Sequence, residues 1–176
     1  MNITGDKTSF AIEWEITTAY TEDCYGSFCL WIEGQQVGDL DYEVHLDASL
    51  YHYDQFLRHK DIRAYRNSSD LSREELFYQL YERFFGDKAK ETGDHLNLGI
   101  YRAIFWLEDI GDASIRDKWN IIIVDEPSQS RQRIIWRHLD VPKEKHEAFL
   151  PGDMFDDVAK QFCKQVSIQW QEHRSV

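Results

Sequence analysis

The residues with the clearest chemical content form an acidic run between positions 39 and 47. Asp39, Asp41, Glu43, His45 and Asp47 occupy every second position, and apolar residues fill the positions between them. Carboxylates and an imidazole can bind hard cations, transfer protons, or accept charge-assisted hydrogen bonds from Lys and Arg. Because a period of two is typical of a half-buried β-strand, we predict that 39–47 is a strand with its acids on one face.

Metal binding and catalysis are weakly supported by this pattern. Same-face neighbours on a strand stand about 7 Å apart, too far for several of them to meet one ion at about 2.0–2.6 Å. The chain has no EF-hand loop, no H-E-x-x-H, no Gly-rich phosphate loop and no G-x-S-x-G. We therefore expect no catalytic residues, no metal and no cofactor, and keep a small metal-assisted hydrolase using the acidic strand 39–47 as the alternative function.

Charge is the strongest guide to a partner. The net charge is −12, and residues 8–57 contain ten carboxylates but neither Lys nor Arg. A row of like charges repels itself, so a basic partner explains it better than folding stability does. The same charge argues against nucleic acid, which needs a basic stripe, and against anionic lipid. An acidic surface that serves only solubility remains an open alternative.

Aromatic residues directly after the acidic run extend the candidate surface. Tyr51 can supply contact area with little loss of side-chain entropy, and Asp54 adds a further carboxylate. A surface of about 800 Å² on each partner would suffice for a specific interface. The other interpretation, a solvated sheet face followed by a core helix, stays open. The predicted partner-binding residues are Asp39, Asp41, Glu43, His45, Asp47, Tyr51 and Asp54.

Other patterns predict the elements that would position this surface. Alternation over 10–16 and apolar residues over 27–33, followed by a turn, predict an N-terminal antiparallel meander that ends in the acidic strand. The β-branched run at 119–124 predicts a strand covered on both faces, with 131–139 as its hairpin partner. Residues 95–107 are ambiguous, and we predict one or two strands there.

Three segments show helical spacing of apolar residues. We predict a short helix over 48–59 capped by Asp47, and a helix after Ser72, where Ser72 and Glu75 have the spacing of a capping box. A last helix should begin at Asp153. The whole chain, 1–176, is then one α+β domain in which an antiparallel sheet, the meander plus a central hairpin, is covered by two or three amphipathic helices.

Cysteine usage and the N-terminus predict a cytosolic protein. Cys24, Cys29 and Cys163 are odd in number and form no C-x-x-C pair, so reduced thiols are expected. The first residues have neither a basic start nor a long apolar run, which argues against a secretory signal. No stretch approaches the roughly 18 apolar residues of a membrane span.

Several segments resemble a family of bacterial immunity proteins, the family catalogued as immunity protein forty-two, found in polymorphic-toxin and contact-dependent growth-inhibition loci. They are FAIEWE (10–15), FCLWIEGQQVGD (28–39), NIIIVDEP (120–127), RQRIIWR (131–137) and FLPGDMF (149–155).

The resemblance implies a protein that binds a cognate toxin domain in the cytosol and blocks its active site or the entry of its substrate. Many such toxins are nucleases with basic clefts, so resemblance and charge together suggest an acidic inhibitor of a nuclease. The resemblance brings no functional residues to particular positions. The site residues given above therefore rest on charge geometry alone, and the oligomeric state stays unspecified.

Overall fold

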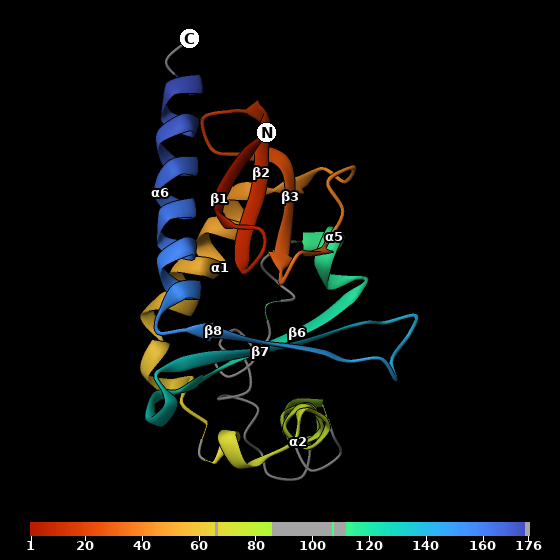
Figure 1. The fold of residues 1–176 in the computed structure, drawn as a ribbon. Coiled ribbons are helices and arrows are strands. Elements are labelled where there is room, and N and C mark those ends of the chain that lie inside the picture. The colour runs from red at the N-terminus through yellow and green to blue at the C-terminus, as the bar shows by residue number, and fades with distance from the viewer. Residues whose placement is uncertain (66, 86–106, 108–111, 175–176) are drawn as a thin grey trace.

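The computed structural model describes residues 1–65, 67–85, 107 and 112–174 and has the predicted α+β architecture, with antiparallel strands and packed helices (Figure 1). Its strands form two sheets instead of one. The strands are β1 (Asn2–Asp6), β2 (Phe10–Ala19), β3 (Cys24–Ile32), β4 (Gln35–Val37), β5 (Val44–His45), β6 (Trp119–Glu126), β7 (Arg131–His138) and β8 (His146–Pro151). The helices are α1 (Leu46–Arg58), α2 (Arg73–Phe85), α5 (Asp112–Arg116) and α6 (Met154–Arg174).

The first sheet has the order β1-β2-β3-β4, and β5 pairs with β3 beside β4. The predicted antiparallel pairing of 10–16 with 27–33 is confirmed by β2 and β3, and the chain returns along β3 as β4 and not as the acidic strand. Gly26 is required at its place, because a Cβ there would lie 1.9 Å from the carbonyl oxygen of Glu15. β1, which sequence analysis did not predict, adds the outer strand through its pairing with β2.

The predicted acidic strand over 39–47 is wrong. Only Val44 and His45 form a strand, and the residues before them form a turn. Helix α1 begins at Leu46, two residues earlier than predicted, with His45 and not Asp47 at the N-cap position. The acids of this segment therefore do not line up on one sheet face.

The second sheet has the order β6-β7-β8 and is covered on both faces. Ile121 and Ile123 of β6 pack into the main core, whereas Ile122 and Val124 pack against α2. This burial on alternate faces confirms the prediction for 119–124, and the antiparallel pairing with β7 confirms its hairpin partner. β8, a strand that the sequence analysis missed, makes β7 the middle strand.

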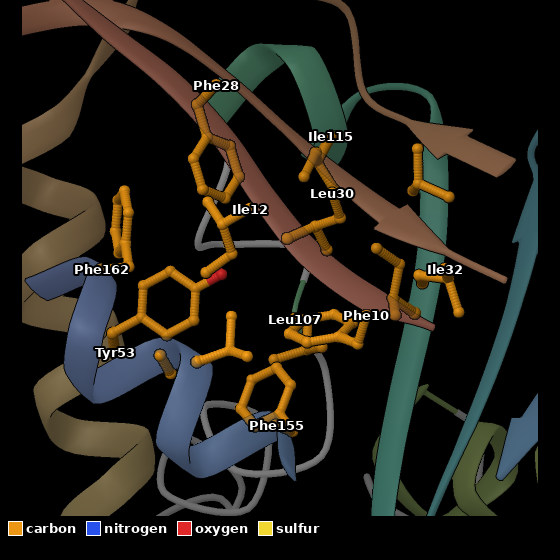
Figure 2. Close-up of a cluster of buried hydrophobic side chains, with 14 of the residues drawn as sticks. Phe10, Ile12, Phe28, Leu30, Ile32, Tyr53, Leu107, Ile115, Phe155 and Phe162 are labelled. Atoms are coloured by element: carbon orange, nitrogen blue, oxygen red, sulfur yellow. The ribbon is translucent and has the colours of Figure 1, made fainter. Parts of the chain in front are cut away.

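The main core lies where α1 and α6 cover the first sheet (Figures 1 and 2). Tyr53 of α1 and Phe162 of α6 have ring centroids 5.3 Å apart. The ring centroid of Phe155, at the start of α6, lies 5.1 Å from that of Phe10 of β2. These aromatic contacts join the two helices to the sheet, because large buried rings supply much of the apolar area that stabilises a core.

Helix α2 covers the other face of the second sheet, and its predicted capping box is confirmed. The backbone N–H of Glu75 donates to Ser72 Oγ at 3.2 Å, and the N–H of Ser72 donates to Glu75 Oε2 at 2.9 Å. The start of α6 after Asp153 is also as predicted. The strands predicted within 95–107 fall outside the described residues, apart from the buried Leu107.

Candidate partner-binding surface

The segment that carries most of the predicted site is a turn fixed by its own first acid. The N–H of Asp41 donates to Asp39 Oδ1 at 3.0 Å, and the N–H of Tyr42 donates to the carbonyl oxygen of Asp39 at 3.3 Å. Asp side chains stabilise turns in this way because they accept from the backbone two residues on. The turn leaves Asp41, Tyr42 and Glu43 exposed before the chain enters β5.

Two of the predicted acids have cationic partners within the chain. Lys118 Nζ lies 3.4 Å from Asp39 Oδ2 and 4.4 Å from the ring centroid of Tyr42. The hydrogen bond from the Asp41 N–H, followed by that from Lys118, lowers the pKa of Asp39. On α1, Arg58 Nε lies 2.7 Å from Asp54 Oδ2, one helical turn away. The charges of Asp39 and Asp54 are therefore partly balanced before any partner arrives.

The other three acids form no ion pair with a Lys or Arg in the part of the chain that the structure describes. Glu43 Oε1 accepts from Thr17 Oγ1 at 2.7 Å, and Asp47 Oδ1 accepts from the Cys24 N–H at 3.1 Å. The imidazole of His45 also adjoins Asp47, with Nδ1 3.8 Å from Oδ1. Neutral donors orient Glu43 and Asp47 without removing their charge.

Helix α1 extends this acidic surface. Asp47, Tyr51 and Asp54 follow one another at spacings of four and three residues, which places them on one helix face. Tyr51 is 62% exposed, and its ring lies 5.6 Å from that of His52. The structure thus joins the predicted residues through a turn, a two-residue strand and a helix face, and not through one flat strand.

The residues next to this surface that sequence analysis missed are Tyr20, Asp23 and Tyr25. The Tyr25 ring centroid lies 4.4 Å from that of His45 and 6.3 Å from that of Tyr20. Desolvation, and then the charges of Asp23, Asp47 and Glu43, raise the pKa of Tyr25, so negative charge gathers on this side of the first sheet. The one sequence signal was a pair of tyrosines that flank Glu22 and Asp23 at a hairpin turn.

Metal-binding groups and reactive thiols are the two features of the described residues that bear on catalysis. No group of three or more His, Cys, Asp or Glu side chains is placed to hold a metal ion within residues 1–65, 67–85, 107 and 112–174. Burial raises the pKa of Cys24 to about 11 and that of Cys29 to about 12, so both stay protonated and are poor nucleophiles at neutral pH. No helix in the described ranges is long and apolar enough to cross a membrane.

Two arginines of β7 pair with acids of the second sheet. Arg131 and Arg133 both contact Glu126 of β6. Arg133 additionally lies against Glu147 of β8. These arginines balance acids of the second sheet and not the acids of the 39–47 segment.

Comparison with known proteins gives this acidic α+β domain a family. Residues 1–165 match the family Immunity protein 42, and the chain belongs to this family of toxin-neutralising immunity proteins. The fold is similar to the crystal structure of CdiI from Burkholderia dolosa AUO158, with a TM-score of 0.72. That match covers 93% of this chain and 99% of the other at 14% sequence identity, which shows the fold alone. No curated protein is similar enough in sequence to be a relative.

Proposed function

We propose that this protein is a non-catalytic inhibitor that binds a cognate toxin domain, a nuclease with a basic cleft, in the cytosol. Family membership supports the neutralising role. The observation that carries the choice of surface is the set of carboxylates of Asp41, Glu43 and Asp47, for which the described residues supply neither Lys nor Arg as a partner.

A nuclease binds phosphates through Lys and Arg side chains, and carboxylates can take the same places. Charge-assisted hydrogen bonds between carboxylates and guanidinium or ammonium groups are shorter and stronger than neutral ones. The net charge of −12 would also attract a basic toxin and raise the association rate at moderate ionic strength. The inhibitor then blocks the cleft because its acids and the substrate's phosphates compete for the same cations.

The predicted residues should contribute unequally. Asp39 and Asp54 must share or release Lys118 and Arg58 to bind a toxin cation, so their net contribution is small. Asp41 and Glu43 are exposed on the turn and have no such competitor among the described residues. Where a toxin cation is fully desolvated against one of them, truncation should cost about 2–5 kcal/mol.

The test is a double charge reversal, Asp41→Lys with Glu43→Lys, titrated against the cognate toxin domain. We expect affinity to fall at least tenfold, about 1.4 kcal/mol, while the melting temperature stays nearly unchanged. The matched control is Asp140→Lys with Glu144→Lys, which makes the same charge change at exposed acids between β7 and β8.

Equal affinity losses in the two double variants would show that net charge alone matters, and an unaltered affinity in the first would remove the turn from the interface. Digestion of DNA and RNA by the toxin, with and without this protein, tests the nuclease assignment. A toxin that digests neither would contradict that assignment without affecting the binding surface.

A further inference from the structure

The tip of the β2–β3 hairpin is held unusually firmly for an exposed turn. The N–H of Tyr20 donates to the carbonyl oxygen of Asp23 at 2.8 Å, which closes the turn. The carbonyl oxygen of Tyr20 accepts from Trp170 Nε1 at 2.9 Å and from Arg174 Nε at 3.2 Å. Helix α6 therefore fixes the backbone of the tip through two hydrogen bonds from its last turns.

This fixed backbone presents an aromatic row, which consists of Tyr20, Tyr25 and His45. Tyr20 is 60% exposed and meets Tyr25 edge to face, and Tyr25 continues the row to His45. The row joins the hairpin tip to β5, where Tyr25 and His45 are register partners. Rigid exposed tyrosines are typical binding anchors, because little conformational entropy is lost when a partner covers them.

The charge and the shape of the surface next to the aromatic row favour a cationic side chain of a partner. Asp23, Glu43 and Asp47 lie close enough to Tyr25 to influence its ionisation. A surface hollow of about 480 Å³ adjoins Tyr20 and is lined by the 19–23 turn with His173 and Arg174. The guanidinium of Arg174 is already placed 4.2 Å from the ring centroid of Trp170. Aromatic faces with three carboxylates beside them thus lie at the edge of an open concave surface.

We propose that the hairpin tip belongs to the toxin-binding surface and that the aromatic row receives an arginine side chain of the toxin. This inference rests on the proposed function and extends its site from 39–54 to the hairpin. A planar guanidinium can stack on a tyrosine face while its N–H groups pair with carboxylates in fork geometry. A lysine ammonium is more strongly hydrated and lacks that planar fork, so arginine fits this combination of groups better.

The experiment titrates wild-type protein and variants with the cognate toxin domain. We expect Tyr20→Ala to weaken binding at least tenfold and Asp23→Asn to weaken it several-fold, because exposed aromatic anchors dominate interface energetics. The matched control is Tyr78→Ala, since Tyr78 of α2 is 64% exposed but lies on the far side of the second sheet from the hairpin. Tyr20→Ala should melt as the wild type does, because this side chain is mostly in solvent.

The arginine is tested from the toxin side. Each arginine of the toxin's cleft is changed to lysine, and each variant is titrated with wild-type and Tyr20→Ala protein. One Arg→Lys change should weaken wild-type binding at least several-fold and lose its effect in the Tyr20→Ala background. Effects that simply add for every arginine would overturn the stacking contact.

The outcomes separate this inference from the proposed function. Wild-type protein that neither binds nor neutralises the toxin would overturn the proposed function. Tight wild-type binding with unchanged affinity in Tyr20→Ala would overturn only the role of the hairpin tip. Sedimentation of the protein alone gives the third outcome: a dimer that Tyr20→Ala dissociates would assign the tip to a second copy of this chain and overturn the inference.

Discussion

The indole Nε1 of Trp170 donates a hydrogen bond of 2.9 Å to the carbonyl oxygen of Tyr20, although the two residues are 150 positions apart. This contact makes the last turns of α6 a support for the hairpin tip. The proposed binding surface is therefore not a free loop, and its rigidity depends on a helix that does not itself supply the acids.

Replacing the two donors should loosen the tip without unfolding the protein. In Trp170→Phe with Arg174→Met, both hydrogen bonds to Tyr20 are lost, at about 0.5–1.5 kcal/mol each. Amide hydrogen exchange over residues 20–24 should become about tenfold faster, and toxin affinity should fall less than in Tyr20→Ala. Lys164→Met, a change at an exposed cation of the same helix, is the control. Unchanged exchange at the tip would show that the turn is rigid by itself.

Association with the toxin should depend strongly on salt. Because exposed charges are screened beyond about 8–10 Å at physiological ionic strength, electrostatic steering weakens as salt rises. We expect the association rate constant, measured by stopped flow, to fall about tenfold or more between 50 and 500 mM NaCl. Asp41→Lys with Glu43→Lys should show a flatter dependence. A salt-independent rate in the wild type would contradict the role given to charge.

A buried ionic cluster at the start of α6 should dominate stability. Arg63 Nη2 lies 2.5 Å from Asp156 Oδ1 with both side chains fully buried, and Arg63 Nε lies 3.4 Å from Asp125 Oδ2. Burial raises the pKa of Asp125, so its charge depends on the cation beside it. We expect Arg63→Met to lower the free energy of unfolding in urea by about 3–5 kcal/mol, because two buried carboxylates lose a buried cation, although Lys60 Nζ still lies 2.9 Å from Asp156 Oδ2.

The control for that cluster is an arginine with a similar pairing at the surface. Arg58→Met breaks the exposed pair with Asp54 and should cost less than about 1 kcal/mol. If the two variants unfold at the same urea concentration, the buried cluster contributes no more than a surface ion pair, and the account of it is wrong.

Glu13 should contribute to stability in a pH-dependent way. Burial acts to raise its pKa, but hydrogen bonds from Lys7 Nζ at 2.7 Å and Trp31 Nε1 at 2.8 Å prevail and lower the pKa below its usual value. Since the folded state favours the carboxylate, its contribution is present above the unfolded pKa and is lost as pH falls through the lower folded pKa. The stability gap between wild type and Glu13→Gln should therefore be largest near pH 7 and shrink towards pH 3.

Urea unfolding at each pH measures that gap, and Glu172→Gln at the exposed end of α6 is the comparison. The comparison variant should follow the wild type throughout the range. A gap that stays constant, or widens, on acidification would contradict the direction of the Glu13 shift.

Elements with one dominant local signal could be predicted from the sequence, whereas elements in which two local signals compete could not. The β-branched run of β6 and the capping box of α2 each have one dominant signal, and both are confirmed. The alternation over 39–47 also predicted a strand, but Asp39 accepts a backbone N–H two residues on and forms a turn instead. Turn chemistry at Gly38 and Asp39 prevailed over periodicity, and Leu46 then opened a helix.

Contacts between residues far apart in the sequence explain which features of the candidate site could not be predicted. Lys118 neutralises part of the charge of Asp39, although the two residues are 79 positions apart in the sequence. No local pattern reveals this pair. The aromatic row likewise depends on the register that places Tyr25 opposite His45. The sequence shows the acids and the tyrosines, whereas their juxtaposition follows from how β3 and β5 pair.

The most direct test of the binding surface is amide hydrogen exchange of the protein with and without its cognate toxin domain. Bound toxin should slow exchange over residues 20–25 and 39–54 and leave α2 and β8 unchanged. Protection confined to α2 or β8, with the hairpin tip and the acidic turn exchanging as in the free protein, would contradict the account.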